Sequence, residues 1–191
     1  MHTIHHTPAV ILKSVHFGEA NKRVWLLTKE FGLIVAAVQG VRKVGAKLQG
    51  HLVDYAFINA DLVRGKEVWR LISCELLHNP LEGNPKLPLA RSYVRTLTLL
   101  ERFLLGEGDH VELYAHVTEI STLISRTDID ERLFDTLSLW RAIAILGYIA
   151  VEEGDEELLH APFDEAIGMM DDAHIRSFIT VVNASIKESQ L

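Results

Sequence analysis

Eight cationic side chains within the first 70 residues have the types and spacing of a phosphate-binding surface. Lys22 and Arg23 precede a short apolar segment, and Arg42, Lys43 and Lys47 lie in a glycine-flanked stretch after a second one. The other three are Arg64, Lys66 and Arg70. Because lysine and arginine neutralise the phosphates of a nucleic-acid backbone, these positions are candidate nucleic-acid contacts. The alternative is a set of solvated loop cations.

Four aromatic residues of the same region, Trp25, Tyr55, Phe57 and Trp69, are candidates for stacking on bases. Such stacking contributes roughly 1–3 kcal/mol per base. Aromatic residues in strands more often face inward, so a position in the core is the competing expectation for each ring.

The charge of the chain is divided unevenly between its halves. The net charge is −7, but residues 1–80 hold ten Lys or Arg against six Asp or Glu, and residues 81–191 hold nine against twenty. A basic half in an acidic chain points to a polyanionic partner for that half. No apolar run approaches the roughly 18 residues of a membrane helix, so we expect a soluble, cytoplasmic protein without a membrane partner.

Other chemistries have weak support in the sequence. His2, His5 and His6 cluster without a carboxylate close by in the sequence, and Cys74 is the single cysteine, so we expect no metal, no cofactor and no internal disulfide. The acidic run 152–157 lacks the spacing of a calcium loop. No nucleophile elbow, P-loop or dinucleotide fingerprint occurs, and a non-enzymatic protein is therefore expected.

Five short segments of the first half are rich in β-branched and aromatic residues and are separated by turn residues. Glycine at position 32 and the Arg64–Lys66 stretch suit tight turns. Five strands in about 70 residues predict a small OB-type barrel, a fold that often binds single-stranded nucleic acid. The segments are 9–15, 24–28, 32–38, 52–58 and 67–72.

Prolines at positions 80, 85 and 88 predict a domain boundary. The expected fold class is α+β, with an OB barrel in residues 1–79, a proline-rich linker in 80–88 and an all-α helical bundle in 89–191.

Helical periodicity begins at Leu89. We expect Asp128 to cap the third helix, with Glu131 at the capping-box position, and Asp171 or Asp172 to cap the last. The predicted helical segments are 89–104, 111–124, about 129–146, 162–170 and a C-terminal helix from about 172.

Several segments together resemble the bacterial RecO recombination mediator family. The combination of Thr-Lys-Glu-Phe-Gly-Leu with a following Gly-x-Arg-Lys and a Lys-Leu pair is the most specific part, and residues 140–148 are similar to the family's helix ending in Leu-Gly-Tyr. The matching N-terminal segments are 9–14, 18–22, 27–34, 40–43, 47–48 and 68–75.

This resemblance implies a DNA repair protein that binds and anneals single-stranded DNA. The implied partners are RecR and the single-stranded DNA-binding protein and, indirectly, the RecA recombinase, and the implied location is the nucleoid within the cytoplasm. The helical half would serve as a scaffold. A non-catalytic adaptor of the recombination machinery with little DNA affinity of its own is the alternative function.

Two departures from the family pattern limit the transfer. Many members carry a four-cysteine zinc insertion, whereas residues 149–172 contain no cysteine, so that module is expected to be absent. Gln39 and Ala46 stand where lysine and serine are common in the family. Fewer cationic contacts predict weaker, more easily salt-disrupted DNA binding.

Overall fold

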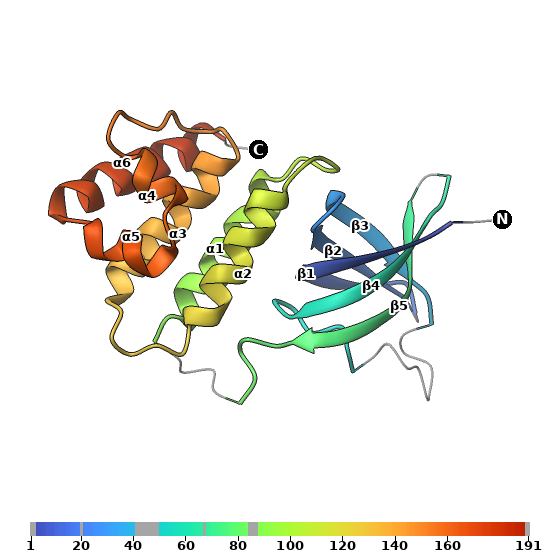
Figure 1. Ribbon diagram of the computed structural model, residues 1–191. Coiled ribbons are helices and arrows are strands. Elements are labelled where there is room, and N and C mark those ends of the chain that lie inside the picture. Colours follow the sequence, from blue (N-terminus) through green and yellow to red (C-terminus); the bar gives the residue numbers. More distant parts are fainter. Residues whose placement is uncertain (1–2, 20, 41–49, 67, 84–87, 190–191) are drawn as a thin grey trace. The chain divides into compact units, whose positions relative to one another are not determined.

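The computed structural model describes residues 3–19, 21–40, 50–66, 68–83 and 88–189 (Figure 1). The chain forms two compact units that are not contiguous in sequence. The barrel unit contains Met1–Gly83 together with Leu104–Tyr114, and the helical unit contains Asn84–Phe103 together with Ala115–Leu191. The limits of 1–79, 80–88 and 89–191 expected from the sequence remain a prediction.

The barrel unit is a closed five-stranded barrel, which confirms the predicted OB architecture followed by helices. Around the barrel, the hydrogen-bonded neighbours follow the order β1-β2-β3-β5-β4, and β4 pairs with β1, which closes the barrel. All pairings are antiparallel except β3 with β5. The strands are β1 Ile4–Phe17, β2 Asn21–Thr28, β3 Gly32–Val38, β4 Phe57–Arg64 and β5 Trp69–His78.

Alternation along each strand divides the barrel into an apolar interior and a polar exterior. On β2, Val24 and Leu26 are fully buried, whereas the preceding Arg23 is exposed and the intervening Trp25 is half-buried. On β3 and β5, Ala36 and Trp69 belong to the same core. Because the side-chain period of a strand is two, Arg23 and Trp25 of β2 and Val35 and Ala37 of β3 face outward, whereas Leu27 and Leu33 on the same sides are buried.

The predicted fourth strand, 52–58, is wrong in its position, since β4 begins at Phe57. Leu52 and Ala56 are buried without belonging to a strand. Tyr55 takes a left-handed φ of 70°, and its N–H donates to the carbonyl of Ile11 at 2.7 Å. The apolar run therefore contains a turn bound to β1. β5 likewise extends well beyond its predicted end at residue 72.

Six helices lie in the described part of the second half, which confirms that it is helical. Five of them lie close to predicted segments, whereas α4 begins inside the run that was expected to be an acidic loop. The helices are α1 Ala90–Phe103, α2 Val111–Leu123, α3 Glu131–Ile145, α4 Glu156–His160, α5 Phe163–Met169 and α6 Asp172–Glu188. Trp140 of α3 stacks on Phe178 of α6 with ring centroids 4.1 Å apart in the core of the helical unit.

The cap of α3 corrects a sequence expectation. Asp130, rather than Asp128, caps the helix by accepting hydrogen bonds from the N–H groups of Arg132 and Leu133. Asp128 instead accepts hydrogen bonds from Arg126, which lower the pKa of its carboxyl to about 2. At α6, Asp171 is the cap, one of the two residues predicted for that role.

The Leu-Gly-Tyr sequence at the end of α3 forms a complete helix stop. Gly147 has a φ of 76°, its N–H donates to Ala144, and the N–H of Tyr148 donates to Ile143, which is the Schellman pattern. The Tyr148 hydroxyl then donates to the carbonyl of Phe103, the last residue of α1, at 3.1 Å. This motif therefore joins the ends of two helices.

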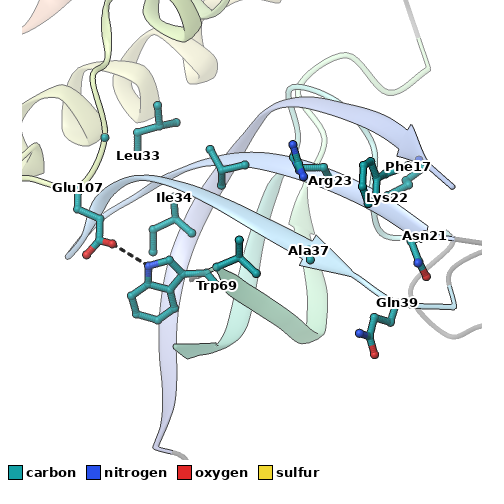
Figure 2. Close-up of a pocket in the computed structure, with 13 residues that line it drawn as sticks. Phe17, Asn21, Lys22, Arg23, Leu33, Ile34, Ala37, Gln39, Trp69 and Glu107 are labelled. Atoms are coloured by element: carbon teal, nitrogen blue, oxygen red, sulfur yellow. Dashed lines mark hydrogen bonds between the residues drawn. The ribbon is translucent and has the colours of Figure 1, made fainter. Parts of the chain in front are cut away.

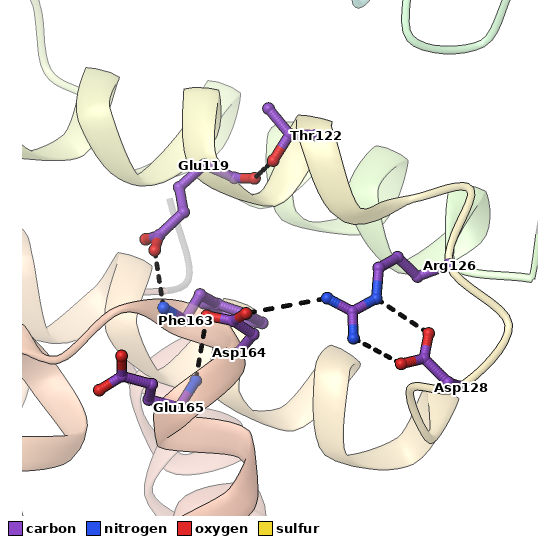
Figure 3. A network of polar contacts seen from close by, with 7 residues as sticks. All are labelled: Glu119, Thr122, Arg126, Asp128, Phe163, Asp164 and Glu165. Atoms are coloured by element: carbon purple, nitrogen blue, oxygen red, sulfur yellow. Dashed lines mark hydrogen bonds and ion pairs between the residues drawn. The ribbon is translucent and has the colours of Figure 1, made fainter.

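A buried polar network holds α2, α3 and the α4–α5 region together. Arg141 is 3% exposed and donates to the carbonyls of Leu158 and Ala161 at 2.6 and 2.7 Å. Its guanidinium also lies 3.6 Å from Glu119, whose carboxylate accepts the N–H of Phe163 at 2.6 Å. Figure 3 shows the Glu119–Phe163 bond beside the surface contacts of Arg126.

No helix within the part of the chain that the structure describes has the length and apolar character needed to cross a membrane.

Candidate nucleic-acid interface

A groove of about 540 Å³ runs along the outside of the barrel over β3. Its floor comes from β3, one end from the start of β2, and the other end from Trp69 and Glu107 (Figure 2). The lining residues are Phe17, Asn21, Lys22, Arg23, Leu33, Ile34, Val35, Ala37, Gln39, Val68, Trp69, Gly106 and Glu107. The outer face of strands 2 and 3 is where OB folds bind oligonucleotides.

Strand register brings two of the predicted cations onto one row of this face. Arg23 of β2 pairs with Ala37 of β3, and Ala37 pairs with Arg70 of β5. Directly paired residues project from the same side of a sheet, and both arginines are exposed. The small Ala37 side chain lies between them; Arg23 and Ala37 line the groove, and Arg70 lies outside its lining.

The end of the groove at the start of β2 combines cations with an exposed ring. Lys22 lines the groove, and the guanidinium of Arg23 lies 4.8 Å from the ring centroid of Phe17. Asn21 accepts the N–H of Gly40 at 3.0 Å, which fixes the point from which the chain leaves β3. The predicted cations Arg42, Lys43 and Lys47 come after this point and lie outside the described residues.

Two further predicted cations lie at the turn between β4 and β5. Arg64 and Lys66 are exposed, and the turn is closed by a hydrogen bond of 3.0 Å from the N–H of Gly65 to the carbonyl of Val68. Arg64 lies over the ring of Trp69, 5.4 Å from its centroid. Lys66 does not line the groove.

The four candidate aromatic residues divide between core and surface. Trp69 and Phe57 are 6% and 5% exposed and are core residues, whereas Trp25 and Tyr55 are half-buried. The ring best placed for stacking is Phe17, which is 58% exposed and was not selected from the sequence. Its position at the end of a strand, directly before Gly18, was the available signal.

The segment Leu104–Tyr114 completes the barrel unit at the other end of the groove. The N–H of Leu33 donates to the carbonyl of Gly106, and the N–H of Gly108 donates to that of Phe31, each at 3.1 Å. Gly32 forms a β-bridge with Glu107. Sequence reasoning missed this segment.

Gly32→Ala should therefore destabilise the barrel unit more than Gly18→Ala. Both glycines have φ near +65°, so each variant bears the cost of a left-handed alanine, about 1 kcal/mol. Only at Gly32 would the added Cβ lie within 2.8 Å of the Gly108 backbone, whereas Gly18 faces open space. Urea unfolding of both variants measures the difference. Equal midpoints would contradict a tight contact at Gly32.

The groove is suited to binding a polyanion but holds one acid. Glu107 accepts the indole N–H of Trp69 at 2.9 Å and lies 3.3 Å from a guanidinium nitrogen of Arg64. Among the residues that the structure describes, no three His, Cys, Asp or Glu side chains are grouped so that they could hold a metal ion. The arrangement therefore offers charge neutralisation and ring stacking.

Comparisons with known proteins identify relatives of this chain. Residues 1–80 match the family described as "Recombination protein O N terminal". The chain is 26% identical over 147 residues to the DNA repair protein RecO of Chlorobium limicola, covering 74% of this chain and 55% of that protein. It is 31% identical over 146 residues to the DNA repair protein RecO of Gloeothece citriformis, covering 72% and 50%. The chain thus spans about half the length of the curated relatives it matches.

Proposed function

Since its residues 1–80 place this chain in the RecO family of DNA repair proteins, we propose that it binds single-stranded DNA along the groove over β2 and β3. The observation that carries the proposal is the row Arg23–Ala37–Arg70, in which two exposed arginines flank a small residue on the outer face of the barrel. Adjacent strands are about 4.8 Å apart, so the two arginines are about 10 Å apart at their backbones. A DNA backbone that crosses the three strands can contact both.

Stacking on exposed rings supplies the second part of the interaction. Phe17 stands beside Arg23 at one end of the groove, and Trp25, on the outer side of β2, lies under the ammonium group of Lys13 at 5.6 Å. Ring faces bind bases without regard to sequence, and cations beside them add attraction for the phosphates. This combination supports sequence-independent binding of single strands.

The finer activities follow from such binding. Annealing of complementary strands requires that the phosphates be neutralised and that the bases stay accessible. A strand held by its backbone along the groove would meet both requirements. We extend the proposal to annealing and, together with RecR and the single-stranded DNA-binding protein, to helping RecA load onto DNA. It assigns no catalytic residue and no cofactor.

The test is fluorescence anisotropy of a labelled oligothymidylate over a salt series. Arg23→Ala with Arg70→Ala should weaken binding at least tenfold and lower the salt-dependence slope by about 1.4, since each single-strand phosphate contact contributes about 0.7. Arg102→Ala with Arg176→Ala, which removes the same charge from exposed positions of α1 and α6, is the matched control.

An unchanged slope in the Arg23/Arg70 variant would contradict the assignment of this face. Failure of the unaltered protein to bind at low salt would favour the adaptor function instead.

A further inference from the structure

We infer that Glu107, which lines one end of the groove, is a built-in competitor of DNA phosphate, an acidic gate that pairs with the neighbouring Arg64 until a strand displaces it. This inference rests on the proposed function and concerns the regulation of the same site. It comes from a segment far from the barrel strands in the sequence.

The carboxylate of Glu107 already makes the contacts that an incoming phosphate would make. Its two oxygens lie 3.4 and 3.3 Å from the same guanidinium nitrogen of Arg64, and one of them accepts the indole N–H of Trp69 at 2.9 Å. Arginine binds carboxylate and phosphate with the same planar array of N–H donors. Glu107 therefore stands in for a phosphate at this end of the groove.

The backbone fixes Glu107 in place. The flanking residues Gly106 and Gly108 exchange hydrogen bonds with Leu33 and Phe31, and Glu107 itself bridges to Gly32. Gly106 has a φ of 130°, and an added Cβ on Gly32 would collide with Gly108. DNA can thus compete for Arg64 without removing the segment from the barrel.

The ion pair is open enough to be exchanged. The Arg64 side chain is 65% exposed and that of Glu107 is 41% exposed, and exposed ion pairs of this kind are weak. When a phosphate takes Arg64, Glu107 keeps the indole N–H of Trp69 as its partner. The carboxylate therefore has a stable arrangement both with and without DNA, which is what a gate requires.

The decisive variant is Glu107→Gln, because glutamine retains an oxygen acceptor for the Trp69 indole while losing the charge. We expect it to bind oligothymidylate about three- to tenfold more tightly, with a salt slope that changes little, because the strand contacts Arg64 in both proteins and only the competing carboxylate charge is lost. Glu75→Gln removes the same charge from an exposed position of β5 that does not line the groove, and should change affinity less than about twofold.

Arg64→Ala tests the mechanism in a double-mutant cycle. If Glu107 acts by occupying Arg64, the gain from Glu107→Gln should fall below about twofold when Arg64 is alanine. An equal gain in both backgrounds would overturn the gate, because it would show only a general charge effect. Glu107→Gln binding no better than Glu75→Gln, or more weakly than the unaltered protein, would also overturn it.

The unaltered protein supplies a second measurement that needs no variant to fold. The indole N–H resonance of Trp69 should shift as oligothymidylate is added, since its acceptor loses the contact with Arg64. A resonance that stays in place while the strand binds would overturn the gate and leave the proposed function standing. Loss of the effect of Arg23→Ala with Arg70→Ala would instead count against the proposed function.

Discussion

Replacing Arg141 with alanine is expected to destabilise the helical unit by about 2–3 kcal/mol, because its buried guanidinium is the charged donor to two carbonyls, whereas its ion-pair partner Glu119 is 38% exposed and can be solvated. The carbonyls of Leu158 and Ala161 would lose their charged donor, and Glu119 would lose its nearest cation. The ring of Phe163, which lies 5.1 Å from the guanidinium carbon, would also lose packing. All three effects act on the junction of α3 with the α4–α5 region.

Urea unfolding followed by circular dichroism at the helical band measures this effect. Arg126→Ala is the matched control, because Arg126 pairs with Asp128 and Asp164 at the surface of the same unit (Figure 3) and its loss should leave the midpoint nearly unchanged. Equal shifts for the two variants would show that the buried position of Arg141 has no special role.

The helical unit is also expected to lose stability as the pH falls from about 6.5 to about 4. His116 is 4% exposed, and its burial lowers the pKa of the imidazole to about 4, with the charge of Arg141 acting in the same direction. Between these pH values the unfolded chain binds a proton that the folded chain does not. Stability is therefore fully present above pH 6.5 and decreases by up to about 1.4 kcal/mol per pH unit, or about 3 kcal/mol in total.

His116→Gln separates this contribution from the other titrating groups. The histidine Nε2 lies 3.0 Å from the carbonyl of Ser138, a contact that a glutamine amide can reproduce without titrating. The variant should show a flatter dependence of unfolding free energy on pH between 4 and 6.5, whereas His16→Gln, at an exposed position of β1, should keep the original slope. Parallel curves for the original protein and His116→Gln would refute the assignment.

The elements that could be predicted from the sequence are those whose signal is local. The apolar, β-branched run in 32–38, the left-handed Gly32 and the glycine stop after α3 each depend on neighbouring residues, and each is found in the structure. The run 52–58 has the composition of a strand, but it forms a turn at Tyr55. This turn is held by a hydrogen bond from Tyr55 to Ile11 of β1, which is distant in sequence. The capping-box position of Glu131 favoured Asp128 as the cap of α3, but Asp128 is bound to Arg126 and Asp130 caps the helix.

The candidate interface could be predicted only in part for the same reason. Cation type and spacing pointed to Arg23 and Arg70, but their common row with Ala37 depends on the pairing of β2, β3 and β5. Glu107 had no recognisable signal, because a carboxylate between two helices has no periodicity that links it to a barrel. Arg42, Lys43 and Lys47 remain predictions.

The contribution of Leu104–Tyr114 to the barrel unit has a consequence during synthesis. All five strands are synthesised before Glu107, so a barrel that forms before this residue is available has the indole N–H of Trp69 and the N–H of Leu33 without their final acceptors. At about 5–20 residues per second, the interval between residues 83 and 114 is roughly 2–6 s. During this interval the barrel unit is incomplete, and α1 must be synthesised before Leu104–Tyr114 can complete it.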